Sequence, residues 1–167
     1  MEKADLNQIE QTLSYEFKDK NLLQEALRHS SYVNEQSVSG LRDNERLEFL
    51  GDAVLNLVVG HILMQRYPEL KEGELSRLRA GMVNESRLAA VAVSINLGNY
   101  IQLGKGELQT RGRKKKSILA NAFEALLAAV YLDGGFSAAF QIIEIRLADL
   151  FRTIVKPVTN LMEVIFA

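Results

Sequence analysis

The stretch Asn44–Leu55, which reads NERLEFLGDAVL, places three carboxylates inside an otherwise apolar helical pattern. Glu45, Glu48 and Asp52 are spaced by three and four residues, so they share one face of a helix. Apolar residues at positions 47, 50, 54 and 58 trace an adjacent face that suits a core. Three anionic groups on one face repel each other. The pattern therefore predicts either a hard divalent cation bound by oxygen ligands or a solvated acidic surface.

Composition restricts the class of protein. The chain has 167 residues, of which 47% are hydrophobic and 25% charged, the balance of a globular domain with a sizeable core. It has no cysteine, which excludes disulfides and thiolate metal sites. Two histidines, His29 and His61, are too few for a histidine-rich zinc site. The start of the chain lacks a signal-peptide pattern, and no uninterrupted apolar run is long enough to span a bilayer. We therefore expect a cytoplasmic protein without a membrane partner.

Nearly every segment has the helical period, and strand signals are scarce. The sequence predicts an all-α domain without internal repeats, in which the only extended piece is a short one at residues 100–103. Asp19, Asp43 and Ser117 are the expected N-caps of three helices, and two glycines end a helix near residue 134. The expected helices cover residues 6–17, 20–27, 44–67, 72–95 with a break near residue 84, 117–132 and 137–155.

Basic residues crowd one segment although the net charge is only −1. Arg111 and the run Arg113–Lys116 belong to a segment punctuated by Gly104, Gly106 and Gly112, which predicts a mobile loop that carries five cations. Phosphate is a natural partner of such a loop. The alternative is a solvated run of charges with no ligand.

The segment 117–135, SILANAFEALLAAVYLDGG, supplies a second pair of oxygen donors. Asn121 and Glu124 lie three residues apart on one face of a helix whose other positions are mostly apolar, so both need partners. Facing the acidic helix, they would complete a ligand set that Mg²⁺ accepts. The alternative is that both satisfy buried hydrogen bonds. A di-iron bundle would need Glu-x-x-His pairs, which neither histidine provides.

Four segments together resemble one family. They are NERLEFLGDAVL, LLQEALRHSSYVNE, EGELSRLRAGMVNE and KKKSILANAFEALLAAVYLDGG, and their order and spacing over residues 5–154 resemble the endonuclease domain of ribonuclease III. The resemblance implies an all-helical domain that forms a homodimer through its signature helices and accepts double-stranded RNA in the valley between subunits. Each subunit would hydrolyse one strand, leaving 5′-phosphate and 3′-hydroxyl ends with short 3′ overhangs, in RNA processing.

The resemblance also implies the metal ligands. Glu48, Asp52 and Glu124 match the family pattern directly, whereas Asn121 stands where the family most often has aspartate. Its carbonyl oxygen can still bind a hard cation. We therefore expect an active endoribonuclease that uses Mg²⁺, with Mn²⁺ as a substitute, and that needs a high metal concentration.

Other positions match surfaces beside the site. Glu45 and Glu72 match auxiliary acids, for which the alternatives are helix capping and solvation. Phe49 and Leu50 match the dimer interface, where Phe49 would insert into a socket on the partner; the alternative is ordinary core packing. The expected RNA-binding residues are His29, Ser30, Asn34, Arg113, Lys114, Lys115, Lys116 and Ser117; for His29 the alternative is a structural hydrogen bond.

We expect the nuclease domain at residues 1–155, and at 156–167 a C-terminal stub or the start of a linker to an RNA-binding domain that the sequence lacks. Binding of duplex RNA should then be weak and strongly salt-sensitive. Two other functions remain open: a duplex RNA-binding protein weakened or inactive in catalysis because of Asn121, and a dimerising scaffold that binds no RNA.

Overall fold

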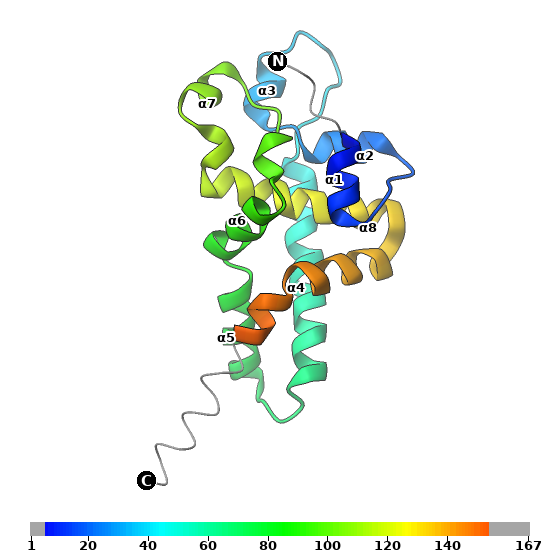
Figure 1. The fold of residues 1–167 in the computed structure, drawn as a ribbon, viewed down its shortest axis with the longest axis vertical. Coiled ribbons are helices and arrows are strands. Elements are labelled where there is room, and N and C mark those ends of the chain that lie inside the picture. Colours follow the sequence, from blue (N-terminus) through cyan, green and yellow to red (C-terminus); the bar gives the residue numbers. More distant parts are fainter. Residues whose placement is uncertain (1–5, 154–167) are drawn as a thin grey trace.

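Two long helices organise the fold. The computed structural model describes residues 6–153, and its longest helices are α4, Glu45–Arg66, and α8, Lys116–Arg146. They form the most extensive helix pair in this part of the chain. In Figure 1, α8 (yellow) crosses the long axis of α4 (cyan) rather than running alongside it. The crossing fixes which side chains of the two helices can meet.

Shorter helices surround this crossing, and the all-α class is confirmed. They are α1 (Leu6–Leu13), α2 (Lys20–Ala26), α3 (Ser30–Asn34), α5 (Glu72–Met82), α6 (Glu85–Ser94) and α7 (Lys105–Gln109), with 3₁₀ turns η1 (Leu97–Asn99) and η2 (Gly112–Lys114). Residues 148–153 are also helical. The only strand-like feature within residues 6–153 is one isolated parallel bridge between Arg28 and Gln102. Of these two residues, Gln102 lies inside the predicted extended piece.

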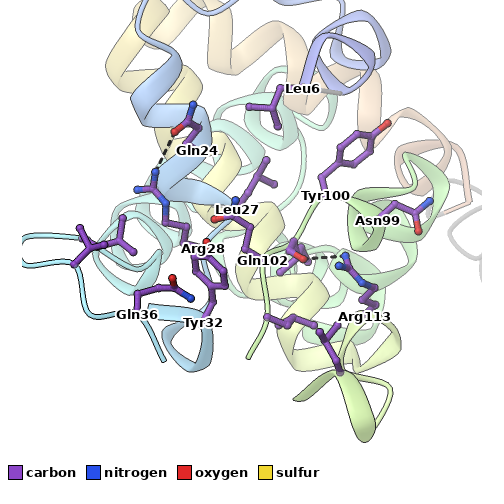
Figure 2. A pocket seen from close by; sticks show the side chains of 15 residues that line it. Leu6, Gln24, Leu27, Arg28, Tyr32, Gln36, Asn99, Tyr100, Gln102 and Arg113 are labelled. Carbon is purple, nitrogen blue, oxygen red and sulfur yellow. Dashed lines mark hydrogen bonds between the residues drawn. The ribbon is translucent and has the colours of Figure 1, made fainter. Parts of the chain in front are cut away.

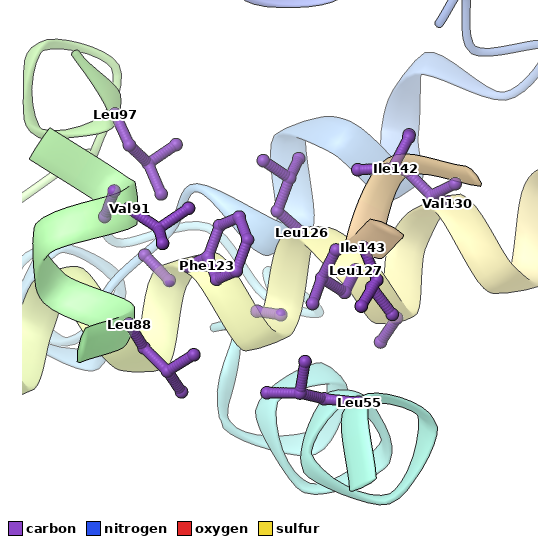
Figure 3. Packing of buried hydrophobic residues seen from close by; sticks show 14 of the residues in the cluster. Leu55, Leu88, Val91, Leu97, Phe123, Leu126, Leu127, Val130, Ile142 and Ile143 are labelled. Atoms are coloured by element: carbon purple, nitrogen blue, oxygen red, sulfur yellow. The ribbon is translucent and has the colours of Figure 1, made fainter. Parts of the chain in front are cut away.

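The core is built around the apolar residues of α8. Phe123, Leu126 and Leu127 are completely buried. Figure 3 shows them along the stretch of α8 that packs on α6, with Leu88, and on α4, with Leu55. Burying side chains of this size contributes roughly 1.5–3 kcal/mol each to folding. The core therefore holds α8, which carries Asn121 and Glu124, in a fixed position against α4, which carries the acidic stripe.

Several predicted helix boundaries are confirmed by their capping bonds. Asp19 caps α2 by accepting a hydrogen bond from the backbone N–H of Asn21 at 2.9 Å. Asn84 separates α5 from α6 and accepts from the N–H of Arg87 at 3.0 Å. Helix α4 ends at Arg66, shortly before Pro68, because the residue that precedes proline disfavours helical geometry.

Other predicted boundaries are wrong by a few residues. Helix α1 ends at Leu13 rather than near Phe17, because Ser14 adopts the left-handed conformation, with φ of 54°. Asn44 rather than Asp43 holds the N-cap position of α4, although the Asp43 carboxylate still accepts from the N–H of Glu45 at 3.1 Å. Helix α8 begins at Lys116, so Ser117 lies inside it and is not its cap.

The glycine pair near residue 134 does break the helix, as predicted. Gly135 has φ of 78° and ψ of −175°, values that only glycine adopts readily. The chain bends there before it continues to Arg146 and the helical residues 148–153. The basic segment, by contrast, is not the open loop that the glycines suggested, since it contains α7 and η2.

Helices α4 and α8 are long and apolar enough to cross a membrane by length and composition alone. Both are core helices of this fold, and α4 also carries the charged residues Glu48 and Asp52. The cytoplasmic location stays a prediction. So does the domain boundary between residues 155 and 156, which lies outside the described residues together with the expected C-terminal stub.

Candidate active site

The acidic stripe of α4 lies beside its buried face. Glu45 and Asp52 are exposed, whereas Glu48 is half-buried. The buried positions, among them Leu47, Val54 and Val58, turn toward the core. The helical period thus places carboxylates at the boundary between core and solvent, as the sequence predicts.

Helices α4 and α8 touch backbone to backbone at the level of this stripe. A Cβ atom added to Gly51 would lie 1.9 Å from the carbonyl oxygen of Glu124 and 2.4 Å from its carbonyl carbon. No side chain can occupy that space, so glycine is required at position 51 for the helices to approach so closely. Glu48 and Asp52, on either side of Gly51, are thereby brought next to Asn121 and Glu124.

The electrostatics confirm that these acids are neighbours. The pKa of Glu124 is raised to about 7, mainly by burial and in addition by the charges of Asp52 and then Glu48. Burial also raises the pKa of Glu48, followed by repulsion from Glu45, while a hydrogen bond from Asn121 opposes the increase. Neighbouring carboxylates therefore make ionisation of Glu48 and Glu124 harder, which is the electrostatic condition for binding a cation.

Two amide side chains compensate part of this charge. The Asn121 side chain donates a hydrogen bond to the Glu48 carboxylate. The Asn56 Nδ2 donates to Asp52 Oδ1 and to the backbone carbonyl oxygen of Asp52, both at 2.9 Å. Sequence reasoning missed Asn56, although its position four residues after Asp52 extends the acidic stripe by one turn.

The donor set fits a hard divalent cation chemically. Glu48, Asp52 and Glu124 supply carboxylate oxygens and Asn121 an amide oxygen, the ligand types that Mg²⁺ prefers. Among residues 6–153, however, no three acidic or histidine side chains converge at ligand distances. Glu48 and Asp52 are instead turned toward amide donors. Because the two backbones are in contact, convergence on one ion depends on side-chain torsions.

Glu72 does not join this group within one chain. It opens α5, which follows the far end of α4, and its carboxylate accepts a hydrogen bond from Ser76 Oγ at 2.7 Å. Eighteen helical residues separate Glu48 from Arg66, a rise of about 27 Å. Glu72 can therefore approach a Glu48 site only from a second copy of the chain.

The segment from His29 to Asn34 forms the short helix α3. His29 is its N-cap, and Nδ1 accepts a hydrogen bond from the N–H of Ser31 at 3.2 Å while also lying 2.8 Å from Ser31 Oγ. Ser31 Oγ in turn accepts from the N–H of Gly104 at 2.9 Å. His29 thus has the structural hydrogen bond that was the alternative to an RNA contact, and Ser30 and Asn34 begin and end α3.

The RNA-binding residues predicted at positions 113–117 divide into two groups, and the first consists of residues that already have partners within the chain. Arg113 donates from Nη1 to the carbonyl oxygens of Gly98 and Ile101 at 2.7 and 2.9 Å, and Figure 2 shows it directed toward that segment. Lys115 forms an ion pair with Glu107, with Nζ and Oε2 2.6 Å apart.

The second group is exposed. It consists of Lys114, Lys116 and Ser117, which lie just before the turn of α8 that carries Asn121. Lys116 Nζ also reaches Ser86 Oγ on α6, at 3.4 Å. Lys116 and Ser117 thus stand on the same helix as Asn121 and Glu124, and Lys114 lies in η2 just before it.

The cavity in Figure 2, of about 620 Å³, is a separate feature. It lies among α2, α3 and residues 99–103, and its lining includes Tyr32, Tyr100 and Arg113 but none of the predicted acidic ligands.

The predicted dimer residues lie at the surface. Phe49 is 82% exposed, which excludes ordinary core packing within this chain, and Leu50 is partly buried against the core. Both line a shallow groove of about 680 Å³ that also includes Leu22 and Leu132. The exposed ring thus stands beside a groove lined by leucines and charged residues, which makes this surface a candidate interface.

Comparison with known proteins identifies the family. The model of the ribonuclease-III-like family matches residues 19–150. The ribonuclease 3 of Desulfotalea psychrophila is 53% identical over 137 residues, which are 82% of this chain and 56% of that protein. The ribonuclease 3 of Syntrophobacter fumaroxidans is 50% identical over 146 residues, which are 87% of this chain and 60% of that protein. The chain thus spans somewhat more than half the length of these curated relatives.

A solved structure agrees with the fold. The nuclease domain of ribonuclease III from Campylobacter jejuni superposes with a TM-score of 0.81 at 44% identity, covering 89% of this chain and 99% of that domain. That structure is described as flexible in a region involved in dimer formation. Given the match of the family model and the identities of about one half, the chain belongs to the ribonuclease III family and has the fold of its nuclease domain.

Proposed function

We propose that this chain hydrolyses double-stranded RNA with the help of a divalent cation held between α4 and α8. The observation that carries the proposal is the backbone contact of Gly51 with Glu124, which gathers three mutually repelling carboxylates at one level of the two helices. Membership of the ribonuclease III family supports the same chemistry. Because the chain spans only part of the length of its relatives, their activity is a proposal for this chain.

Mg²⁺ is the proposed ion, with Mn²⁺ as a substitute, and Glu48, Asp52, Glu124 and Asn121 are its proposed ligands. A divalent ion bound there would polarise a phosphate oxygen and lower the pKa of a bound water. Without a cation the pKa of Glu124 is about 7, and a divalent cation bound beside it would favour the ionised, ligating form and release the proton. Asn121 holds the Glu48 carboxylate by a hydrogen bond.

Duplex RNA is the proposed substrate. An A-form duplex presents its phosphates and 2′-hydroxyl groups but hides its base edges in a deep major groove, so recognition by shape is expected and sequence preference should be weak. Of the predicted cations, Lys114 and Lys116 remain exposed for phosphate. Arg113 and Lys115 already have partners inside the chain, so we propose them as supports of the basic segment.

We also propose that two copies associate through α4. Phe49, Leu57 and Met64 are 82, 59 and 67% exposed, and their spacing places them along one side of that helix. Leu132 and Phe136 add apolar surface from α8. This apolar stripe adjoins the acidic stripe of Glu48 and Asp52, so a dimer formed on it would bring the two acidic sites to the edges of one interface. It would also allow Glu72 of one copy to approach the site of the other.

A second function is kept open by Asn121. Its donated hydrogen bond neutralises part of the Glu48 charge without any cation, which suits a protein that binds duplex RNA but cleaves it poorly. The two functions differ in what Mg²⁺ does. The nuclease requires the ion for strand scission, whereas a binding protein retains the duplex intact.

Incubation of the chain with a labelled RNA duplex in Mg²⁺ tests the proposal. We expect fragments from the duplex and none from the same strands unpaired. Glu124→Gln, which removes the charge but keeps the shape, should abolish detectable cleavage, while Glu16→Gln, at an exposed position between α1 and α2, should leave it unchanged. An intact duplex that is nevertheless retained in a gel shift with Ca²⁺ would favour the second function. An intact duplex without a gel shift would reject both.

A further inference from the structure

Asn56 makes an unusual pair of bonds on α4. Its side-chain Nδ2 lies 2.9 Å from Asp52 Oδ1 and 2.9 Å from the backbone carbonyl oxygen of the same residue. A primary amide has two hydrogens, so both can be donated to Asp52 at once. No other residue of the described acidic stripe is held by its own helix in this way.

Two bonds to one residue fix the orientation of its side chain. An exposed aspartate on a helix surface can otherwise rotate among staggered torsions. With one Asn56 hydrogen anchored on the backbone oxygen and the other on Oδ1, the Asp52 carboxylate is held in one direction. Oδ2 remains without a bond from Asn56 and is available as a single oxygen ligand.

We propose that Asn56 is a positioning residue, which orients the Asp52 carboxylate for the divalent cation. The inference rests on the proposed function and goes beyond it, because Asn56 belongs neither to the predicted ligand set nor to the predicted RNA-binding residues. Residues that hydrogen-bond to metal ligands restrict ligand geometry and contribute substantially to metal affinity.

The position of Asn56 in the helix supports this role. Asparagine is an unfavourable residue in the interior of an α-helix, where its side chain competes for backbone hydrogen bonds. Asn56 lies in the middle of the 22-residue helix α4 and is only half-buried, so packing of the core does not require it. Replacement by alanine should therefore leave the helix as stable as before or make it more stable.

A similar arrangement holds the other α4 ligand. Asn121 of α8 donates to Glu48, as Asn56 donates to Asp52. Each of the two carboxylates thus has its own amide donor, one from the same helix and one from the facing helix. Each amide turns its carboxylate in a defined direction, so replacement of either by a side chain that neither donates a hydrogen bond nor binds the cation should lower the metal affinity.

The test compares Asn56→Ala and Asn56→Leu with the unchanged chain. Alanine removes the donor, and leucine removes it while keeping most of the side-chain volume. The first measurement is the Kd for Mn²⁺ by isothermal titration calorimetry without RNA. The second is the melting temperature in EDTA. Gln65→Ala, at an exposed position near the end of α4, is the matched control.

We expect both variants to bind Mn²⁺ about 10–100-fold more weakly, with a melting temperature that is unchanged or higher, and the control to match the unchanged chain. The Mg²⁺ concentration for half-maximal cleavage should rise in parallel, while the rate at saturating Mg²⁺ recovers. Asn56→Gln, which keeps the amide, should restore part of the affinity.

A loss of affinity below about fivefold in both variants overturns the inference, since ligand-orienting residues act more strongly than that. A lower melting temperature in both variants with unchanged Mn²⁺ affinity also overturns it, because the role of Asn56 would then be structural. If the unchanged chain itself neither binds Mn²⁺ nor cleaves duplex RNA, the proposed function fails instead, so the two failures are distinguishable.

Discussion

Gly51 of α4 lies so close to the backbone of Glu124 in α8 that a methyl group on Gly51 would overlap the Glu124 carbonyl group. This contact determines both the packing of the two helices and the position of the proposed metal ligands. The same level of the two helices carries the carboxylates of Glu48 and Asp52 on one side and the side chains of Asn121 and Glu124 on the other. Any change that separates the helices here separates the proposed ligands as well.

Gly51→Ala should therefore damage both folding and the site. The added Cβ would meet backbone rather than a flexible side chain, so α4 and α8 must move apart, at a cost of about 1–3 kcal/mol or more in the free energy of unfolding. Urea denaturation measures this cost. Gly60→Ala on the same helix is the control: its Cβ would lie 3.8 Å from the Arg79 side chain, and we expect a neutral effect or a gain of up to about 1 kcal/mol. Equal stability of the two variants would contradict the close contact.

Stability without metal should decrease as the pH rises. The pKa of Glu124 is about 7 in the folded chain, against an ordinary value of 4.5, because of burial and the charges of Asp52 and Glu48. A raised carboxyl pKa contributes stability that is complete below pH 4.5 and is lost as the pH rises through about 7. We expect a decrease of about 1–3 kcal/mol between pH 5 and pH 8 in EDTA.

Glu124→Gln should remove most of that pH dependence, while Glu16→Gln should retain it. The measurement is urea denaturation of the three proteins across this pH range. Because Glu48 also has a raised pKa, a small residual slope is expected in Glu124→Gln. A stability that rises with pH in the unchanged chain would show that the carboxylates do not repel each other as described.

Asn121→Asp should change the metal requirement. The new carboxylate adds a charged ligand but removes the hydrogen bond that Asn121 donates to Glu48. We expect the Mg²⁺ concentration for half-maximal cleavage to fall by about tenfold, the scale on which metal-site partners act, and the stability in EDTA to fall. Gln141→Glu adds the same charge at an exposed position of α8 and is the control. Superimposable Mg²⁺ curves for Asn121→Asp and the unchanged chain would reject a ligand role for position 121.

Phe49→Ala should weaken self-association without loss of folding. Phe49 is 82% exposed in the single chain, so its truncation leaves the core intact, whereas a buried aromatic anchor in an interface contributes at least about 2 kcal/mol. Sedimentation equilibrium should give a dimer Kd raised by at least about 30-fold. Val93→Ala, 61% exposed on α6, should not change the Kd. A monomeric unchanged chain would contradict the proposed dimer.

The helices were predicted well where the apolar periodicity agrees with a capping or helix-breaking residue at the end of the segment. The boundaries at Asp19, Asn84 and the glycine pair follow from local rules, because caps and left-handed residues act within one turn. Two boundary predictions were wrong, namely that Ser117 caps α8 and that α1 extends to Phe17. Neither boundary has a recognisable signal in the sequence: Ser14 is left-handed although it is not glycine, and Lys115, at the N-cap position of α8, makes no side-chain capping bond.

The candidate site was predictable only in part. Glu48, Asp52 and Glu124 stand out in sequence because charge on an apolar helix needs a partner. The contact that brings them together depends on Gly51, which looks unremarkable in a sequence and gains its meaning from the crossing of two helices. Asn56 was missed because an asparagine one turn after an aspartate has no special signal. The inward direction of Arg113 depends on the carbonyl groups of Gly98 and Ile101, which come from a distant turn.

The central claim is that α4 and α8 together hold a divalent ion that supports hydrolysis of duplex RNA. End-group analysis of the fragments of a long RNA duplex, incubated with the chain in Mg²⁺, tests it most directly. The account predicts fragments with 5′-phosphate and 3′-hydroxyl ends that form only with the metal and disappear in Glu124→Gln. Fragments that form equally in EDTA, or that carry cyclic phosphate ends, would contradict it.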